Sequence, residues 1–302
     1  MNRAAPTEPT LAQRLRGIAV DSIKQWVDDR AASKGAALAY YTLFSLAPVL
    51  IIVLAIAGVV FGEDAARGAI FHELRGLVGQ DGAQAIQLLL AHARDPKTGI
   101  IATAIALVLL IIGATTVFGE LKESLDEIWR VPKSHKPGVM QFIRTRLLSF
   151  SVILVLAFLL LVSLAVNAAL SLLEQYLGGF WADAAWILQP LSSLVSFAVI
   201  AALFGAIYKL LPQQHLPWRD VVIGSIGTAL LFILGKRLIG VYLGNSNVVG
   251  SYGAAGSVIA LMVWVYYSAQ IFFLGAEFTR QYALWFGSLE NCRSEMQARP
   301  KV

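Results

Sequence analysis

Two adjacent basic residues, Lys236 and Arg237, lie inside a long apolar stretch and are the first candidates for chemistry. If that stretch is a membrane span, its charged side chains are costly and usually face a bundle interior or a cavity that serves a ligand. Ammonium and guanidinium groups there could hold a phosphate or a carboxylate. Long basic side chains can instead extend to the headgroups at the membrane edge. The pair therefore predicts either an anion-binding pocket or two anchoring side chains.

The segment that follows favours the anion-binding interpretation. Residues 244–251 are uncharged and rich in Gly, Asn and Ser, and a new apolar stretch begins near Tyr252 and Gly253. The start of a helix presents free N–H groups and a partial positive charge, which suit phosphate or carboxylate. Gly253 and Gly256 would let a ligand approach the backbone closely. A plain hairpin between two helices would need the same residues.

A second candidate surrounds Pro48, in the middle of another apolar stretch. Proline offers no N–H to the carbonyl of Phe44, so a helix kinks there, and the hydroxyl of Ser45 can bond a freed carbonyl. Broken helices line the binding sites of many transporters, but kinked helices also occur for packing alone. We expect Pro48 and Ser45 either to border a binding site or to shape the packing.

Glu277, Tyr40 and Tyr41 each have an interfacial explanation. Glu277 and Arg280 lie one turn apart at the end of the last apolar stretch, and an ion pair between them would explain both. The alternative for Glu277 is a carboxylate that couples proton movement to transport. The two tyrosines fall where aromatic belts anchor spans at the membrane edge.

The residues that hydrolytic or metal chemistry requires are scattered along the sequence. Its four histidines fall in separate segments, its only cysteine is Cys292, and no CxxC or HExxH spacing occurs. Hydrolysis of a phosphodiester usually needs metals held by clustered carboxylates or histidines. The sequence therefore predicts no enzyme, no catalytic residues, no metal and no cofactor.

The elements that must position these residues follow from composition. Hydrophobic residues make up 57% of the 302 residues and charged residues 14%, whereas soluble domains carry about 25% charged residues. About 20 apolar residues cross the hydrocarbon core as a helix. Stretches long enough to do so contain no Asp, Glu, Lys or Arg, namely 36–62, 99–119, 147–173, 184–208 and 238–276. A polytopic membrane protein is therefore predicted.

The fold class is predicted to be all-α with six membrane helices, over 36–62, 99–119, 147–173, 186–210, 221–243 and 252–276. Turn residues at 244–247 divide the last two. Of the 24 Lys and Arg residues, 18 fall on one side of the membrane and four on the other. The positive-inside rule then places both termini in the cytoplasm. The net charge of +5 is mostly a topology signal, so no nucleic-acid partner is expected.

Three regions follow from these boundaries. Residues 1–35 form a cytoplasmic amphipathic segment, 36–276 the six-helix membrane domain, and 277–302 a cytoplasmic tail. The membrane domain includes an outer helical loop at 63–98 and a cytoplasmic loop at 120–146, where Pro132 is expected to end a helix. The first region predicts a helix on the inner leaflet, with a capping box at Thr10 and Gln13 and an apolar stripe of Leu11, Leu15, Ile18, Ser22 and Trp26.

Several segments together resemble the YihY/BrkB family of bacterial inner-membrane proteins, which has carried an older ribonuclease BN-like label. They are Ala36 to Pro48, Ile128-Trp129-Arg130-Val131-Pro132, Gly235-Lys236-Arg237 with Tyr242, Ser251 to Ser257, and Leu274-Gly275-Ala276-Glu277. The resemblance runs from about residue 30 to 285. It implies a six-helix protein of the cell inner membrane, with associations to virulence, serum resistance and envelope lipid.

These residues and this resemblance favour a transporter or lipid-handling protein for an anionic envelope lipid or metabolite, with membrane lipids as partners. The expected ligand site comprises Lys236, Arg237, Tyr252, Gly253, Gly256, Pro48 and Ser45, with Glu277 as a candidate coupling residue. One alternative is a non-transporting envelope scaffold, which would tolerate replacement of Lys236 and Arg237. Another is a membrane-bound hydrolase, which would require clustered acids or histidines.

Overall fold

The computed structural model describes residues 10–44, 116–132, 184–214, 216–245 and 254–290, with eight single positions between 58 and 87. Four helices have both ends described: α1 (Leu11–Asp28), α6 (Ala184–Leu210), α7 (Trp218–Asn245) and α9 (Ala254–Phe286). Residues 31–44 and 116–128 are helical as well, and these described ranges contain no strand. The all-α prediction is confirmed for this part of the chain.

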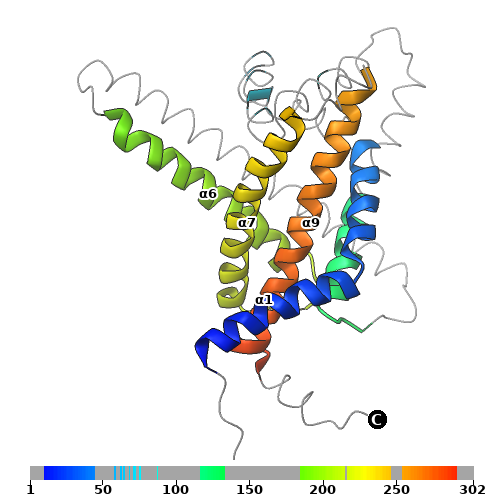
Figure 1. Cartoon of the computed structure of the whole chain (residues 1–302), viewed down its shortest axis with the longest axis vertical. Helices are drawn as coiled ribbons and strands as arrows, with labels where there is room; N and C mark the ends of the chain where they lie inside the picture. The colour runs from blue at the N-terminus through cyan, green and yellow to red at the C-terminus, as the bar shows by residue number, and fades with distance from the viewer. Residues whose placement is uncertain are drawn as a thin grey trace, which may run out of the picture.

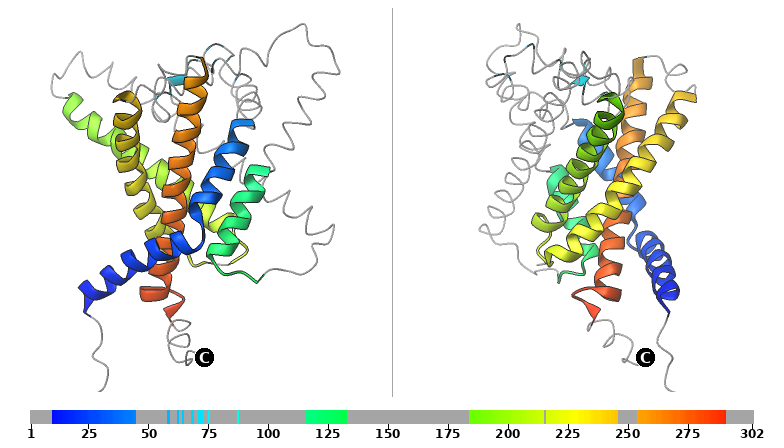
Figure 2. Two further views of the ribbon diagram at one scale, coloured as in Figure 1. Left: turned by 45° about the vertical axis from the view of Figure 1, so that its right-hand side comes forward. Right: turned by 90° about the vertical axis from the view of Figure 1, so that its left-hand side faces the viewer.

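The helices form a bundle in which α7 and α9 run side by side (Figure 1). The helix α1 crosses one end of that bundle, which we call the α1 end, and the opposite end is the far end. Both α6 and α9 finish at the α1 end, whereas α7 begins there (Figures 1 and 2). Lys236 and Arg237, late in α7, are therefore near the far end, and Glu277, late in α9, is near the α1 end.

Three of the described helices are long and apolar enough to cross a membrane, over Ser193–Leu210, Trp218–Tyr242 and Val258–Phe286. They correspond to the last three predicted spans. The helix α9 continues past its predicted end at residue 276 to Phe286, because Glu277 is buried against other helices instead of starting a solvated tail. The first predicted span is described only to residue 44, as a helix, and the second only from 116 onwards. The third lies outside the described residues.

Close approach of α7 and α9 depends on glycines that face threonines. Gly224 lies against Thr279, and Gly275 lies against Thr228. Each threonine hydroxyl donates to a carbonyl one turn earlier on its own helix, Thr228 to Gly224 at 2.8 Å and Thr279 to Gly275 at 2.7 Å. These bonds satisfy the hydroxyls locally, and small residues let two membrane helices pack backbone to backbone.

Tyr208 of α6 joins that helix to the other two. Its side chain is fully buried, and its hydroxyl donates to the carbonyl of Phe272 at 2.8 Å and lies 3.3 Å from Thr228 Oγ1. The rings of Phe204 and Phe272 pack against the phenol, with centroids 6.3 and 5.2 Å away. Because a buried phenol needs a hydrogen-bond partner, these contacts fix α6 in place near the α1 end.

The helix α1 begins with the predicted capping box and then packs against α9. The Thr10 hydroxyl accepts from the Gln13 N–H at 3.4 Å, and the Thr10 N–H donates to Gln13 Oε1 at 2.9 Å. Gly17 lies against the ring of Trp285. Nearer the end of the helix, Trp26 Nε1 donates to the carbonyl of Gln270 at 3.2 Å.

The predicted apolar stripe of α1 is divided between two surroundings. Ile18 and Ser22 are buried, whereas Leu11 and Leu15 are 68% and 55% exposed. The division arises because α1 crosses α9 obliquely and its first turns extend beyond that helix (Figure 1). The stripe therefore serves packing against α9 in its second half, and contact of the exposed first half with the leaflet surface stays a prediction.

Candidate functional site

The two predicted basic residues lie on different faces of α7. Lys236 is half-buried and Arg237 is exposed, as expected for neighbours about 100° apart around a helix. The candidate span ends at Tyr242, so at 1.5 Å per residue both lie about 7–9 Å inside that end. Both therefore lie within the last two turns of the candidate span.

Arg237 belongs to an exposed apolar face of α7. Leu230, Leu234, Leu238 and Val241 on the same side are 57–64% exposed. Side chains of this kind on a membrane helix contact lipid chains. The guanidinium of Arg237 therefore shares its face of α7 with exposed apolar side chains.

Lys236 lies on the side of α7 that faces α6. On this side of α7, about three turns before Lys236, Ser225 lies against Gly205 of α6. One turn before Lys236, the centroid of the Phe232 ring lies 5.5 Å from that of Phe204. Among the side chains described on α6, burial begins only at Phe204. The two helices diverge towards the far end (Figures 1 and 2). Lys236 therefore lies on the α6-facing side of α7, one turn beyond the contact of Phe232 with Phe204.

The remaining predicted site residues are located only in part. Gly256 is buried in the first turn of α9, at the same end of the bundle as Lys236. Around Gly240, one turn beyond Lys236, no atom of the described residues lies within 4 Å of where a Cβ would lie. The other four predicted site residues lie outside the described part of the chain, so their role stays a prediction; they are Tyr252, Gly253, Pro48 and Ser45.

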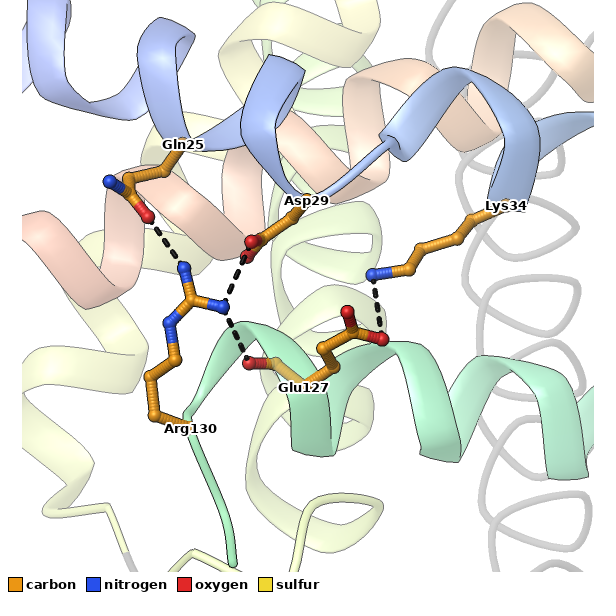
Figure 3. Close-up of polar contacts among 5 residues, drawn as sticks. All are labelled: Gln25, Asp29, Lys34, Glu127 and Arg130. Carbon is orange, nitrogen blue, oxygen red and sulfur yellow. Dashed lines mark hydrogen bonds and ion pairs between the residues drawn. The ribbon is translucent and has the colours of Figure 1, made fainter. Parts of the chain in front are cut away.

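A cluster of charged side chains that the sequence did not predict lies at the α1 end (Figure 3). Arg130 pairs with Asp29 Oδ1 at 2.9 Å and donates to Gln25 Oε1 at 2.6 Å. Beside them, Lys34 Nζ lies 3.3 Å from Glu127 Oε2. We define the charged junction as these five residues together with Glu277 and Arg280 of α9.

Two arginines in the left-handed backbone region form the turns next to the junction. Arg30 follows α1 with φ 53°, and Arg130 follows the 116–128 helix with φ 55°. A residue just past a helix end often adopts this conformation. After the second helix, the Val131 N–H donates to the carbonyl of Asp126 at 2.8 Å, and Pro132 follows as predicted. This turn holds Arg130 where its guanidinium reaches α1.

Glu277 is the most buried member of the junction. Its exposed fraction is 0%, and among the described residues neither carboxylate oxygen has a hydrogen-bond partner. Its electrostatic neighbours are Asp29, Arg280 and Arg130. The expected pairing with Arg280 is present only as an attraction between the two charges. Arg280 donates no hydrogen bond to either carboxylate oxygen. Glu277 is therefore a buried acid within α9.

The acids of the 116–128 helix near the junction have different surroundings. Lys122 pairs with Asp126 at 2.5 Å, and Asp126 also accepts from the Gln213 N–H at 2.8 Å, which ties the 116–128 helix to the loop after α6. Partial burial and the charge of Glu123 raise the pKa of Glu120 above its usual value. Within the described ranges, no group of three or more His, Cys, Asp or Glu side chains is arranged to hold a metal.

Residues 22–294 match the protein family described as Virulence factor BrkB. The chain belongs to the BrkB family. The match includes the charged junction as well as Lys236 and Arg237. Together with the three apolar helices, membership identifies this BrkB-family chain as a membrane protein. No solved structure matches it.

Curated relatives of this BrkB-family chain are named UPF0761 membrane proteins. One from Psychrobacter sp. (strain PRwf-1) is 28% identical over 257 residues, which cover 84% of this chain and 46% of the relative. Another, from Stenotrophomonas maltophilia (strain R551-3), is 29% identical over 280 residues, covering 86% and 59%. A third, from Pseudomonas aeruginosa (strain LESB58), is 27% identical over 261 residues, covering 83% and 59%. The aligned part is thus about half to three fifths of each relative.

Proposed function

We propose that this BrkB-family protein transports or otherwise handles an anionic envelope lipid or metabolite in the bacterial inner membrane. In this proposal the chain spans the membrane six times with both termini in the cytoplasm, so the far end faces the periplasm. Lys236 and Arg237 hold the acidic group of the ligand, and Gly256 with the other predicted site residues borders it. The protein acts by binding and moving its ligand and catalyses no hydrolysis.

The observation that carries the proposal is the exposed guanidinium of Arg237 on an apolar face of α7. A charge at this position is stabilised by an anion, and an arginine can bind a phosphate through two parallel hydrogen bonds. An anionic lipid can interact with both the guanidinium and the apolar side chains of this face. Its phosphate meets Arg237, and its acyl chains lie along neighbours such as Leu230 and Leu234.

Lys236 supports the same ligand from the adjacent face. It is half-buried on the side of α7 that faces α6, and the ammonium group acts as a point charge that tolerates several ligand orientations. The open surroundings of Gly240 leave space one turn further along. A phosphate lying between the two basic groups would receive hydrogen bonds from both.

Anchoring at the membrane edge is the competing explanation for the pair. Basic side chains that only extend to the headgroups take whatever lipid is present and retain none after purification. A ligand site instead retains a particular lipid class through solubilisation. The two explanations therefore differ in a measurable quantity, the occupancy of anionic lipid on the purified protein.

We expect the protein purified in a mild detergent to retain an anionic lipid detectable by native mass spectrometry. Lys236→Ala and Arg237→Ala should each lower its occupancy, and loss of one such contact corresponds to about a tenfold change in affinity. Arg237→Lys should be milder, because the charge is kept and only the two-pronged hydrogen bonding is lost. The matched control is Arg219→Ala, which removes an exposed arginine at the other end of α7.

Occupancy in Arg219→Ala should equal that of the unmodified protein. Unchanged occupancy in the double variant Lys236→Ala with Arg237→Ala would refute the ligand site and leave anchoring as the explanation. The same would follow if the retained lipids matched the membrane composition without enrichment of acidic headgroups.

A further inference from the structure

The charged junction brings two carboxyl groups together inside the protein. The side chain of Asp29 is 6% exposed and Glu277 is 0% exposed. Hydrogen bonds from Trp26 Nε1 to the Gln270 carbonyl and from Gln270 Nε2 to the Ala31 carbonyl hold the turn that carries Asp29 against α9, and Asp29 is the acid that acts on the Glu277 carboxyl. We call them the carboxyl pair. It joins the end of α1 to α9, at the opposite end of the bundle from Lys236 and Arg237.

The carboxyl pair has fewer hydrogen-bond donors than it needs. Asp29 Oδ1 forms an ion pair with the guanidinium of Arg130, 2.9 Å from its nitrogen Nη1. Asp29 Oδ2 and both oxygens of Glu277 have no hydrogen-bond partner among the described residues. An ionised carboxylate only accepts hydrogen bonds, so two of them facing each other cannot satisfy one another. Leaving buried polar atoms unsatisfied is costly.

We infer that Asp29 and Glu277 bind one proton between them. A hydronium ion of the solvent gives its proton to a carboxylate oxygen and leaves as water, and the protonated group can then donate a hydrogen bond to the other. One O–H···O hydrogen bond then satisfies two of the three unpaired oxygens, and no other bond forms or breaks. Two carboxyl groups that share a site take up protons as a coupled unit.

The charges around the pair favour a proton over a metal cation. Charged residues on the elements that meet at this end of the bundle include Arg280 on α9, Asp220 on α7, Arg30 and Lys34 just after α1, and Glu127 and Arg130 at the end of the 116–128 helix. Arg130 and Arg280 already act on the pair and would repel a metal cation. Lys34 is engaged by Glu127, and Asp220 accepts from Ser288. A shared proton supplies the hydrogen-bond donor that the two carboxyl groups lack, and it needs no further side chain to hold it.

The shared proton links the position of α1 to that of α9. With the proton bound, the pair forms a hydrogen bond between the two helices. Without it, two carboxylates face each other, and their repulsion weakens the contact of α1 with the bundle. Proton uptake at the α1 end therefore changes how firmly α1 is held. This holds whether or not an anionic lipid binds at the far end.

Infrared difference spectroscopy in lipid nanodiscs tests this directly. We expect a C=O stretching band of a protonated carboxylic acid that shifts in heavy water and disappears as the pH is raised. Glu277→Gln and Asp29→Asn should each abolish it, because each removes one member of the pair while keeping a neutral side chain that can hydrogen-bond. The matched control Glu290→Gln removes an exposed acid just past α9 and should keep the band.

Thermal unfolding of the same samples serves as the check that the variants are folded. Glu277→Gln should also flatten the pH dependence of the unfolding temperature. The amide keeps a hydrogen-bonding side chain at this position but binds and releases no proton. The inference is overturned if the unmodified protein shows no acid band at any pH, or if the band survives in both Glu277→Gln and Asp29→Asn. It is equally overturned if sodium ions, compared with choline, stabilise the protein through Glu277 while no acid band is present.

Discussion

Replacing Gly275 with alanine is expected to destabilise the helix bundle by about 1–3 kcal/mol, the usual cost of overpacking a well-packed contact. A Cβ at this position would collide with the side chain of Thr228, and one at Gly224 would collide with Thr279. Neither threonine can rotate away without breaking the hydrogen bond to its own helix. Gly224→Ala should therefore have a similar effect.

Alanine in a helix is intrinsically more favourable than glycine by about 1 kcal/mol. A loss of stability in these variants therefore arises from the collision at the helix contact. The matched control is Gly240→Ala on α7, where a Cβ would meet no atom within 4 Å in the described part of the chain. The control should leave the unfolding temperature in detergent unchanged or raise it, while the two interface variants lower it. A Gly275→Ala protein as stable as Gly240→Ala would show that α7 and α9 do not pack through these residues.

Arg130→Ala is expected to cost about 1–3 kcal/mol of stability, the usual cost of leaving a buried hydrogen-bond acceptor without its partner. The cost arises at Asp29, whose side chain is 6% exposed and would lose the guanidinium at 2.9 Å. Lys34→Ala is the matched control within the charged junction. Its partner Glu127 is 42% exposed, so water replaces the lost contact and the effect should stay below about 1 kcal/mol.

Two further variants separate charge from backbone effects at Arg130. Arg130→Gly should be less harmful than Arg130→Ala, because φ is 55° and glycine adopts this conformation without strain. Adding Asp29→Asn to Arg130→Ala should restore part of the stability, since no ionised group is then left unpaired. Denaturant or thermal unfolding of the set measures both effects. Equal losses for Arg130→Ala and Lys34→Ala would contradict the assigned role of Arg130.

Local features of the fold were predictable because they depend on neighbours in the sequence. The capping box at Thr10 requires only Gln13 three residues later, and Pro132 ends a helix by its own covalent structure. The charge-free stretches located α6 and the first part of α9, and the turn residues at 244–247 separated α7 from α9. The different exposures of Lys236 and Arg237 followed from helix periodicity alone.

The charged junction was not predictable because it depends on tertiary contacts. Arg130 and Gln25 are 105 positions apart, and nothing in either segment indicates the other. The end of α9 was placed at residue 276 because charge returns at Glu277, yet that acid is buried beside Asp29. The Trp-Arg-Val-Pro segment was noted only as part of a family resemblance, and the left-handed turn at Arg130 explains what its arginine does.

The most direct test of the proposed ligand site is photocrosslinking in nanodiscs with a phosphatidylglycerol whose reactive group lies near the phosphate. A phosphatidylcholine reagent of the same design serves as the control. We predict that the anionic reagent labels peptides of α7 near Lys236 and Arg237, several-fold more than the zwitterionic one does, and that the double alanine variant loses this preference. Equal labelling of α7 by the two reagents, or a preference that survives in the double variant, would contradict an anionic lipid site on this helix.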